Sequence, residues 1–171
     1  MTAAFTDTEA MEGVVVRRPG RFADSRGHLT EFFRRDEMAD SSFPAMGYLS
    51  VTNPGLSRGP HEHVDQTDTF FFPGPGEFLV ALWDNRKGSA TFGRRMVVAA
   101  GASSPAVVVA PPGVVHAYRC ISKDAGTVVN VPNRLYRGEG KTQPVDEVRH
   151  EDDPANPFLV DLARIASERR A

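Results

Sequence analysis

The sequence predicts an all-β fold, an antiparallel sandwich or barrel, followed by a short C-terminal helix. Short apolar or alternating runs follow one another between residues 13 and 133, and each is bounded by Gly, Pro, Asn, Asp or Ser. No helical stretch separates these runs, which argues against a parallel α/β fold. The chain has 171 residues, a length that suits one domain with a single core.

The expected strands are found at regular intervals along the chain. They are GVVVRR (13–18), HLTEFFRR (28–35), GYLSVTN (47–53), DTFFFPG (68–74), EFLVALWD (77–84), RRMVVAAG (94–101), AVVVAPPG (106–113), HAYRCIS (116–122) and TVVNVPN (127–133). A turn or two of helix is expected at RDEMAD (35–40). Residues 1–12 are expected to be flexible, and residues 13–171 to form one domain.

The predicted C-terminal helix runs from Phe158 to Arg169. Its apolar residues recur at three- and four-residue spacing, after Asn156 and Pro157 as start signals. This pattern indicates a helix that packs one face against the domain or against a second subunit.

Composition narrows the classes of partner and compartment. The formal net charge is −2, so nothing favours binding to nucleic acid or to an anionic membrane surface. Cys120 is the single cysteine, which rules out an intrachain disulfide and makes a reducing cytoplasm the expected location. The N-terminal residues carry acidic groups and no apolar core of a signal peptide, and no apolar run approaches the roughly 20 residues of a membrane span.

The segment LSRGPHEHVDQTD (56–68) concentrates groups that could bind a metal. His61 and His63 are two residues apart, so on a strand both point to the same face, and Asp68 follows at the next strand. His116 follows a Pro-Gly turn in PPGVVH. Three imidazoles and one carboxylate suit a divalent Mn, Fe, Co, Ni or Zn ion with open positions. Alternatively, His63 and Asp68 face solvent and only His61 and His116 lie inside, hydrogen-bonded and without metal.

These residues resemble the two motifs of the cupin superfamily. HEHVDQTD with the glycines of PGPG is similar to the first motif, with Asp68 in place of the usual glutamate. PPGVVHAYRC is similar to the second motif, with Cys120 where asparagine is common. The resemblance implies a cupin jelly-roll barrel with its site inside the barrel mouth.

A longer resemblance, over roughly residues 20–158, points to one cupin branch, the dTDP-4-dehydrorhamnose 3,5-epimerases. The segments that carry it are FADSRGHLTEF (22–32), Arg58-Gly59-Pro60-His61, DNRKGSATFG (84–93), PPGVVHAY (111–118) and the EDDP that ends in Asp153-Pro154. The resemblance implies an RmlC-like homodimer that inverts carbons beside the keto group of a 4-keto-6-deoxy nucleotide sugar.

The resemblance also implies roles for individual residues. His61 would be the catalytic base and Asp153 its orienting partner, because a carboxylate fixes the tautomer of the ring and raises its basicity. Arg26 and Arg58 would hold the diphosphate, which suits bidentate guanidinium groups, in part from the neighbouring subunit. Further substrate-binding residues would be Glu31 at the nucleotide, His116 at the sugar, and Tyr136.

The chain departs from the resembled family at two catalytic positions. The family lysine that supports the enolate falls near Asp68 and Thr69, and the family tyrosine that returns the proton falls near Val129 and Asn130. Tyr118 and Tyr136 are the nearby phenols. Two other functions therefore stay open: a metal-dependent cupin enzyme, such as an oxygenase, isomerase or lyase, and a non-catalytic binder of nucleotide sugars. A metal-bound His61 could not also act as a free base.

Overall fold

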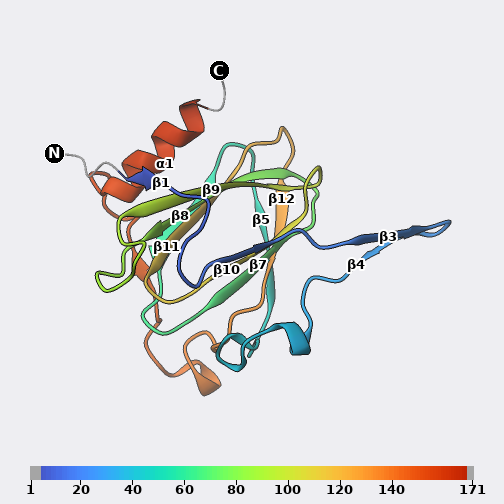
Figure 1. Cartoon of the computed structure of the whole chain (residues 1–171), viewed down its shortest axis with the longest axis horizontal. Helices are drawn as coiled ribbons and strands as arrows, with labels where there is room; N and C mark the ends of the chain where they lie inside the picture. The colour runs from blue at the N-terminus through green and yellow to red at the C-terminus, as the bar shows by residue number, and fades with distance from the viewer. Residues whose placement is uncertain (1–4, 169–171) are drawn as a thin grey trace.

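The computed structural model describes residues 5–168 and shows two β-sheets packed face to face (Figure 1). One sheet has the strand order β1-β9-β8-β11-β6-β13 and the other has the order β2-β10-β7-β12-β5. A third sheet is the two-stranded hairpin β3-β4, which projects away from the sandwich. The predicted all-β fold class is therefore confirmed.

The strands of the first sheet are β1 (Thr6–Asp7), β6 (Ser57–Glu62), β8 (Glu77–Asp84), β9 (Arg94–Gly101), β11 (Val114–Cys120) and β13 (Val148–Arg149). Those of the second are β2 (Val15–Arg17), β5 (Tyr48–Thr52), β7 (Asp68–Phe72), β10 (Ala106–Ala110) and β12 (Gly126–Asn130). The hairpin joins β3 (Arg21–Asp24) to β4 (Gly27–Thr30). Three 3-10 turns lie at η1 (Arg35–Glu37), η2 (Asp40–Ser42) and η3 (Glu139–Lys141), and one α-helix, α1, spans Pro157–Glu168.

Alternation along β8 explains why the first sheet is buried on both faces. Phe78, Val80 and Leu82 point into the core between the two sheets. The intervening residues, among them Trp83, point to the other side, where they pack against Phe158 and other apolar residues of α1. Figure 1 shows α1 lying beside this sheet. The expectation that the C-terminal helix packs on the domain is confirmed, with Arg169 outside the described residues.

The N-terminal segment is more ordered than the sequence suggested. The strand β1 pairs in parallel with β9, the Phe5 ring lies 5.1 Å from the Phe158 ring, and Met11 is buried. Residues 5–12 are therefore part of the packed domain, because Phe5 packs on the helix-bearing face of the first sheet and Met11 packs in the core between the sheets. Residues 1–4, where the predicted flexible segment begins, lie outside the described part of the chain.

The segment Asp84–Gly93 forms a structural turn. The Asp84 carboxylate is fully buried and accepts hydrogen bonds from Arg86, Ser89 and Thr91. Burial alone would raise the pKa of Asp84, but these donors outweigh it and hold that pKa well below its usual range. This part of the family-like sequence thus stabilises the β8-β9 connection.

No described helix is long and apolar enough to cross a membrane.

Candidate active site

The strand β6 brings His61 next to His116 of β11. The two residues are directly paired across the strands, and their ring centroids are 4.5 Å apart. At Gly59 the two strands are so close that a Cβ atom would lie 2.4 Å from the His116 carbonyl oxygen. Gly59 also has a φ of +76°, in the left-handed region that favours glycine. The glycine of the RGPH segment therefore permits the close approach that joins the two histidines.

Two glutamates lie beside the Nδ1 atom of His61. The distance from Nδ1 is 3.5 Å to the nearer oxygen of Glu147 and 3.8 Å to that of Glu151. Both carboxylates are largely shielded from solvent, with side-chain exposures of 13% and 27%. The strand β13 brings them there, because it pairs with β6 at His61. This arrangement gives His61 a carboxylate environment on one side of its ring.

Asp153 does not take the role that the family resemblance implied. Its carboxylate is exposed and accepts a hydrogen bond from the backbone N–H of Ala155, 2.9 Å away, in the turn before α1. Glu147 and Glu151 lie beside His61 in its place. The sequence did not reveal them, since they lie in a polar stretch expected to be a loop. The only signal was alternation, because Glu147, Arg149 and Glu151 are two residues apart around β13.

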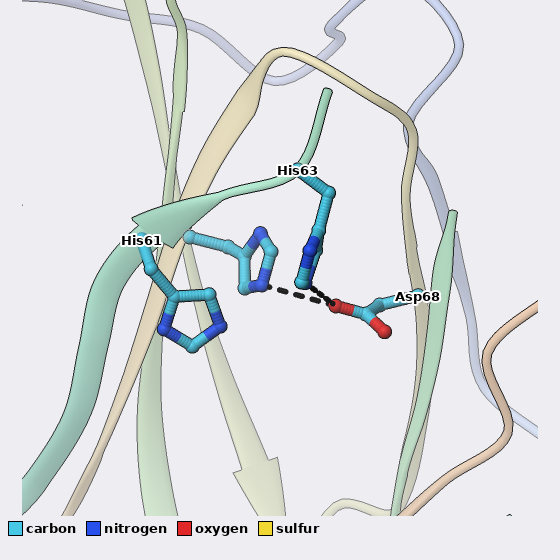
Figure 2. A group of neighbouring side chains, drawn as sticks. His61, His63 and Asp68 are labelled. Atoms are coloured by element: carbon cyan, nitrogen blue, oxygen red, sulfur yellow. Dashed lines mark ion pairs between the residues drawn. The ribbon is translucent and has the colours of Figure 1, made fainter. Parts of the chain in front are cut away.

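A second group of side chains lies on the other side of His61 and consists of His63, Asp68 and His116. Oδ2 of Asp68 is 3.0 Å from Nε2 of His63 and 3.3 Å from Nε2 of His116. Figure 2 shows His63 and Asp68 pointing toward one another, with the ring of His61 beside them. One ligand atom from each of these three and from His61 can be chosen so that all four lie within 4.8 Å of one another. The structure thus brings together the four residues predicted as metal ligands.

Neighbouring groups fix the orientation of this cluster. Nδ1 of His63 contacts the Asp146 carbonyl oxygen, and Nδ1 of His116 lies 3.0 Å from the Val114 carbonyl oxygen. The Asp68 oxygen that faces away from the histidines, Oδ1, accepts hydrogen bonds from the side-chain amides of Asn130, at 2.8 Å, and Gln66, at 3.0 Å. The three residues are almost completely buried. The alternative in which His63 and Asp68 face solvent is therefore wrong.

Burial and charge act in opposite directions in this cluster. Burial lowers the pKa of His116, and the nearby His61 adds to this effect. Burial also opposes protonation of His63, but the Asp68 carboxylate outweighs it and raises the pKa of that ring. Burial would raise the pKa of Asp68, yet His116 and His63 hold it well below its usual range. Asp68 is therefore an anion that needs positive charge nearby.

His61 and His63 open onto a pocket of about 1540 Å³. Cationic side chains surround it: Arg58, Arg134, Arg137, Lys141 and Arg149. Arg58 is held by the backbone carbonyl of Val51, 2.9 Å away, and by Thr52. Tyr136 also lines the pocket and is half exposed. The lining also carries the carboxylates of Glu139, Asp146, Glu147 and Glu151, so its positive charge is local. A pocket larger than the usual size for a small ligand, with arginines at such positions, suits an extended molecule that carries anionic groups.

Arg26 and Glu31 do not line this pocket. Arg26 is at the tip of the β3-β4 hairpin, where its exposed guanidinium pairs with Asp24 at 2.6 Å. Glu31 follows β4 and lies 3.6 Å from Arg34. Within the single subunit, these two predicted substrate-binding residues are separated from His61, Arg58 and Tyr136. Arg26 and Glu31 could contact a substrate only if they reach the pocket of a neighbouring subunit.

Two phenols lie close to the place where the family tyrosine was expected. Asn130 pairs with Tyr48 across β12 and β5, and its amide donates to the Tyr48 hydroxyl at 3.0 Å. The Tyr118 hydroxyl lies 2.9 Å from the Ser50 hydroxyl. Both tyrosines line the pocket, and burial raises the pKa of Tyr48 to about 12 and that of Tyr118 above its ordinary value. Both therefore carry their protons near neutral pH.

Comparison with known proteins finds a matching family model and similar sequences. Residues 8–154 match the family model described as dTDP-4-dehydrorhamnose 3,5-epimerase. The chain is 35% identical to the probable low-salt glycan biosynthesis epimerase Agl13 of Haloferax volcanii over 67% of this chain and 73% of that protein. It is 33% identical to the spore coat polysaccharide biosynthesis protein SpsL of Bacillus subtilis, over 74% and 82% of the respective chains.

A solved structure supports the same relation. The crystal structure of ChmJ, a 3'-monoepimerase from Streptomyces bikiniensis in complex with dTDP-quinovose, is 25% identical in sequence. It superimposes with a TM-score of 0.73, over 90% of this chain and 76% of that one.

Proposed function

Because the chain belongs to the dTDP-4-dehydrorhamnose 3,5-epimerase family, we propose that it epimerises a 4-keto-6-deoxy sugar linked to a nucleoside diphosphate. In this reaction a base removes a proton from a carbon beside the keto group, and an acid returns a proton to the opposite face. The carbon–hydrogen bonding electrons pass to the keto oxygen as an enolate forms, and return when the new bond is made. No oxidant or second substrate is needed.

The observation that carries the proposal is the position of His61. The ring opens onto the pocket, while Glu147 and Glu151 lie beside its Nδ1 atom. Nδ1 makes no hydrogen bond with the described residues, but both carboxylates lie within 4 Å of it. A hydrogen bond from Nδ1 to either of them would orient the ring and leave the other nitrogen free to accept a proton. His61 is therefore proposed as the base, with Glu147 and Glu151 in the orienting role first expected of Asp153.

The cations around the pocket support binding of the nucleoside diphosphate. Arg58 has its guanidinium already positioned by Val51 and Thr52, so little side-chain freedom is lost on binding. Arg134 and Arg137 provide further groups of the type that bind phosphate oxygens in a bidentate manner, whereas Arg149 pairs with Glu147 at 3.0 Å.

Tyr48 and Tyr118 are proposed as the sources of the returning proton. Asn130 occupies the place where the family tyrosine was expected, and an amide cannot supply a proton in this way. Both phenols stay protonated near neutral pH, as their raised pKa values indicate. The names of two relatives refer to glycan and coat polysaccharide biosynthesis, which supports a role for the product in a polysaccharide.

The test is exchange of solvent deuterium into dTDP-linked 4-keto-6-deoxy sugars, followed by NMR. The protein should catalyse exchange at one or both carbons that flank the keto group. His61→Asn should reduce the exchange rate by at least about 100-fold, as expected for loss of a general base.

The Lys123→Ala variant is the control, because Lys123 is exposed in the β11-β12 turn outside the pocket lining. Tight binding of the sugar nucleotide with no exchange above the uncatalysed rate would instead identify a non-catalytic binder.

A further inference from the structure

We propose that Nε2 of His63, Nε2 of His116 and the carboxylate of Asp68 together bind a divalent transition-metal ion beside His61. The binding site is inferred from the geometry of these three residues alone. The chemical role of the ion rests in addition on the proposed epimerase function.

Backbone carbonyl oxygens define the tautomer of His63 and His116. Both use Nδ1 to face a backbone carbonyl oxygen, Asp146 for His63 and Val114 for His116. A carbonyl oxygen only accepts hydrogen bonds, so each Nδ1 must carry a proton. In a neutral ring Nε2 then has no proton and presents a lone pair. The side-chain amide of Gln66, 3.2 Å from Nε2 of His63, is placed to donate to it, in agreement with this tautomer.

The surroundings of the two Nε2 lone pairs indicate that a cation is needed. Nε2 of both rings points at the same carboxylate oxygen, at 3.0 and 3.3 Å. Two lone pairs and an anionic oxygen repel one another unless a cation lies among them. Nε2 of His116 is also buried without a hydrogen-bond partner among the described residues. The cluster therefore needs either an added proton or a metal ion.

The distances fit a metal ion. With metal–ligand bonds of about 2.1 Å, neighbouring ligand atoms are about 3.0 Å apart in octahedral and about 3.4 Å apart in tetrahedral geometry. The two nitrogen–oxygen distances of 3.0 and 3.3 Å fall in this interval. The Asp68 oxygen is therefore at ligand spacing from both nitrogens, and the group offers donor atoms that all lie within 4.8 Å of one another.

The surrounding groups have the pattern found around bound metals. The carbonyl oxygens of Asp146 and Val114 orient the two rings, and Asn130 holds the Asp68 oxygen that faces away from them. Gln66 also touches this oxygen, so its amide can stay there when an ion replaces its contact with His63. Two imidazoles and one carboxylate suit Mn, Fe, Co, Ni or Zn and leave positions for other ligands.

His61 lies at the edge of this site and is assigned a separate role. It makes no ion pair with Asp68, whereas its Nδ1 atom lies near Glu147 and Glu151. A divalent ion bound by the other three residues would supply positive charge at Asp68, where the resembled family has a lysine. His61 would then remain free to accept a proton. This arrangement accounts for both the metal-like cluster and the missing lysine.

The experiment is elemental analysis and Co²⁺ titration of untagged protein, with visible absorption and thermal shift as readouts. We expect close to one tightly bound metal ion per chain. Asp68→Asn and His63→Ala should weaken Co²⁺ binding by at least about 10- to 100-fold. His61→Asn should still bind Co²⁺ but should lose deuterium exchange. His28→Asn, a change in the exposed hairpin, should retain Co²⁺ binding and the absorption spectrum of the bound Co²⁺.

Circular dichroism of each variant separates loss of the site from loss of the fold. Protein that contains no metal and binds no Co²⁺, Ni²⁺, Mn²⁺ or Zn²⁺ would overturn the proposal and indicate a protonated His–Asp cluster. Binding unchanged in Asp68→Asn and His63→Ala would do the same, because the metal would then lie elsewhere. Loss of binding in His61→Asn would refute the three-ligand assignment. Metal binding without deuterium exchange would refute the epimerase function and leave the site intact.

Discussion

At the scale of single residues, the two nitrogens of His61 face different chemical surroundings. Nδ1 lies near Glu147 and Glu151, whereas the cluster of His63, Asp68 and His116 lies on the other side of the ring. The glutamates can orient the base, while the cluster can supply positive charge. This division depends on which nitrogen faces which group, so it can be tested by changing one side at a time.

Substitution of Glu147 or Glu151 should slow the reaction although His61, the proposed base, is still present. Glu151→Gln and Glu147→Gln should each lower kcat for deuterium exchange by about tenfold or more, because the amide no longer stabilises the charge that forms on His61. The double variant should be less active than either single one. Glu9→Gln, an exposed glutamate outside the pocket lining, is the matched control. Full activity in both single variants would contradict the orienting role.

At the scale of elements, α1 is joined to the first sheet by a buried ionic contact as well as by apolar packing. Asp161 accepts a hydrogen bond from Nε1 of Trp83 at 2.8 Å and pairs with Arg95 at 2.8 Å. Arg164 binds the same carboxylate at 2.7 Å. Burial raises the pKa of Asp161, but these donors outweigh it, so the net effect lowers the pKa.

The lowered pKa predicts how the contribution of α1 depends on pH. The folded state favours the charged carboxylate, so the stabilisation is complete above the unfolded pKa of about 4 and is lost as pH falls through the lower folded value. Asp161→Asn should reduce the free energy of unfolding by about 3 kcal/mol at pH 7, because Arg95 loses its buried partner. Urea unfolding of both proteins at pH 7 and pH 3 measures this. A difference that does not shrink at pH 3 would contradict the assignment.

At the scale of the whole molecule, the β3-β4 hairpin projects away from the sandwich (Figure 1). Two of its apolar side chains are exposed to solvent. Phe22 is 67% exposed and Leu29 is 75% exposed. The second sheet ends in the strand β5, on which Leu49 and Val51 are also exposed. Exposed apolar groups on a projecting hairpin and on an edge strand are typical of an interface. They support the predicted homodimer, in which Arg26 would reach the partner's pocket.

The homodimer gives a prediction about assembly and about substrate binding. Light scattering after size-exclusion chromatography should give the mass of two chains, and Phe22→Ser with Leu29→Ser should shift it toward one. Arg26→Ala should raise KM for the sugar nucleotide while the dimer persists. Ile121→Ser, a change of an exposed apolar residue on a turn, should leave the mass unchanged. A wild-type chain that runs as a monomer would contradict this model.

The sequence by itself determined the fold class and most of the metal-like cluster. Alternating runs bounded by turn residues predict strands, because side-chain direction has a period of two in a strand. The same period placed His61 and His63 on one face. Arg58, which the family motif predicts to hold the diphosphate, precedes His61 on the same strand and lines the pocket, and its role stays a prediction.

Only the tertiary structure decided which acid lies beside His61 and which nitrogen of each ring faces the cluster. Glu147 and Glu151 reach His61 from more than 80 residues away, because β13 pairs with β6, and a strand of two residues leaves almost no periodic signal. Asp153 matched a motif, but the turn before α1 uses its carboxylate locally. Contacts between distant segments depend on strand pairing, which local sequence patterns do not specify.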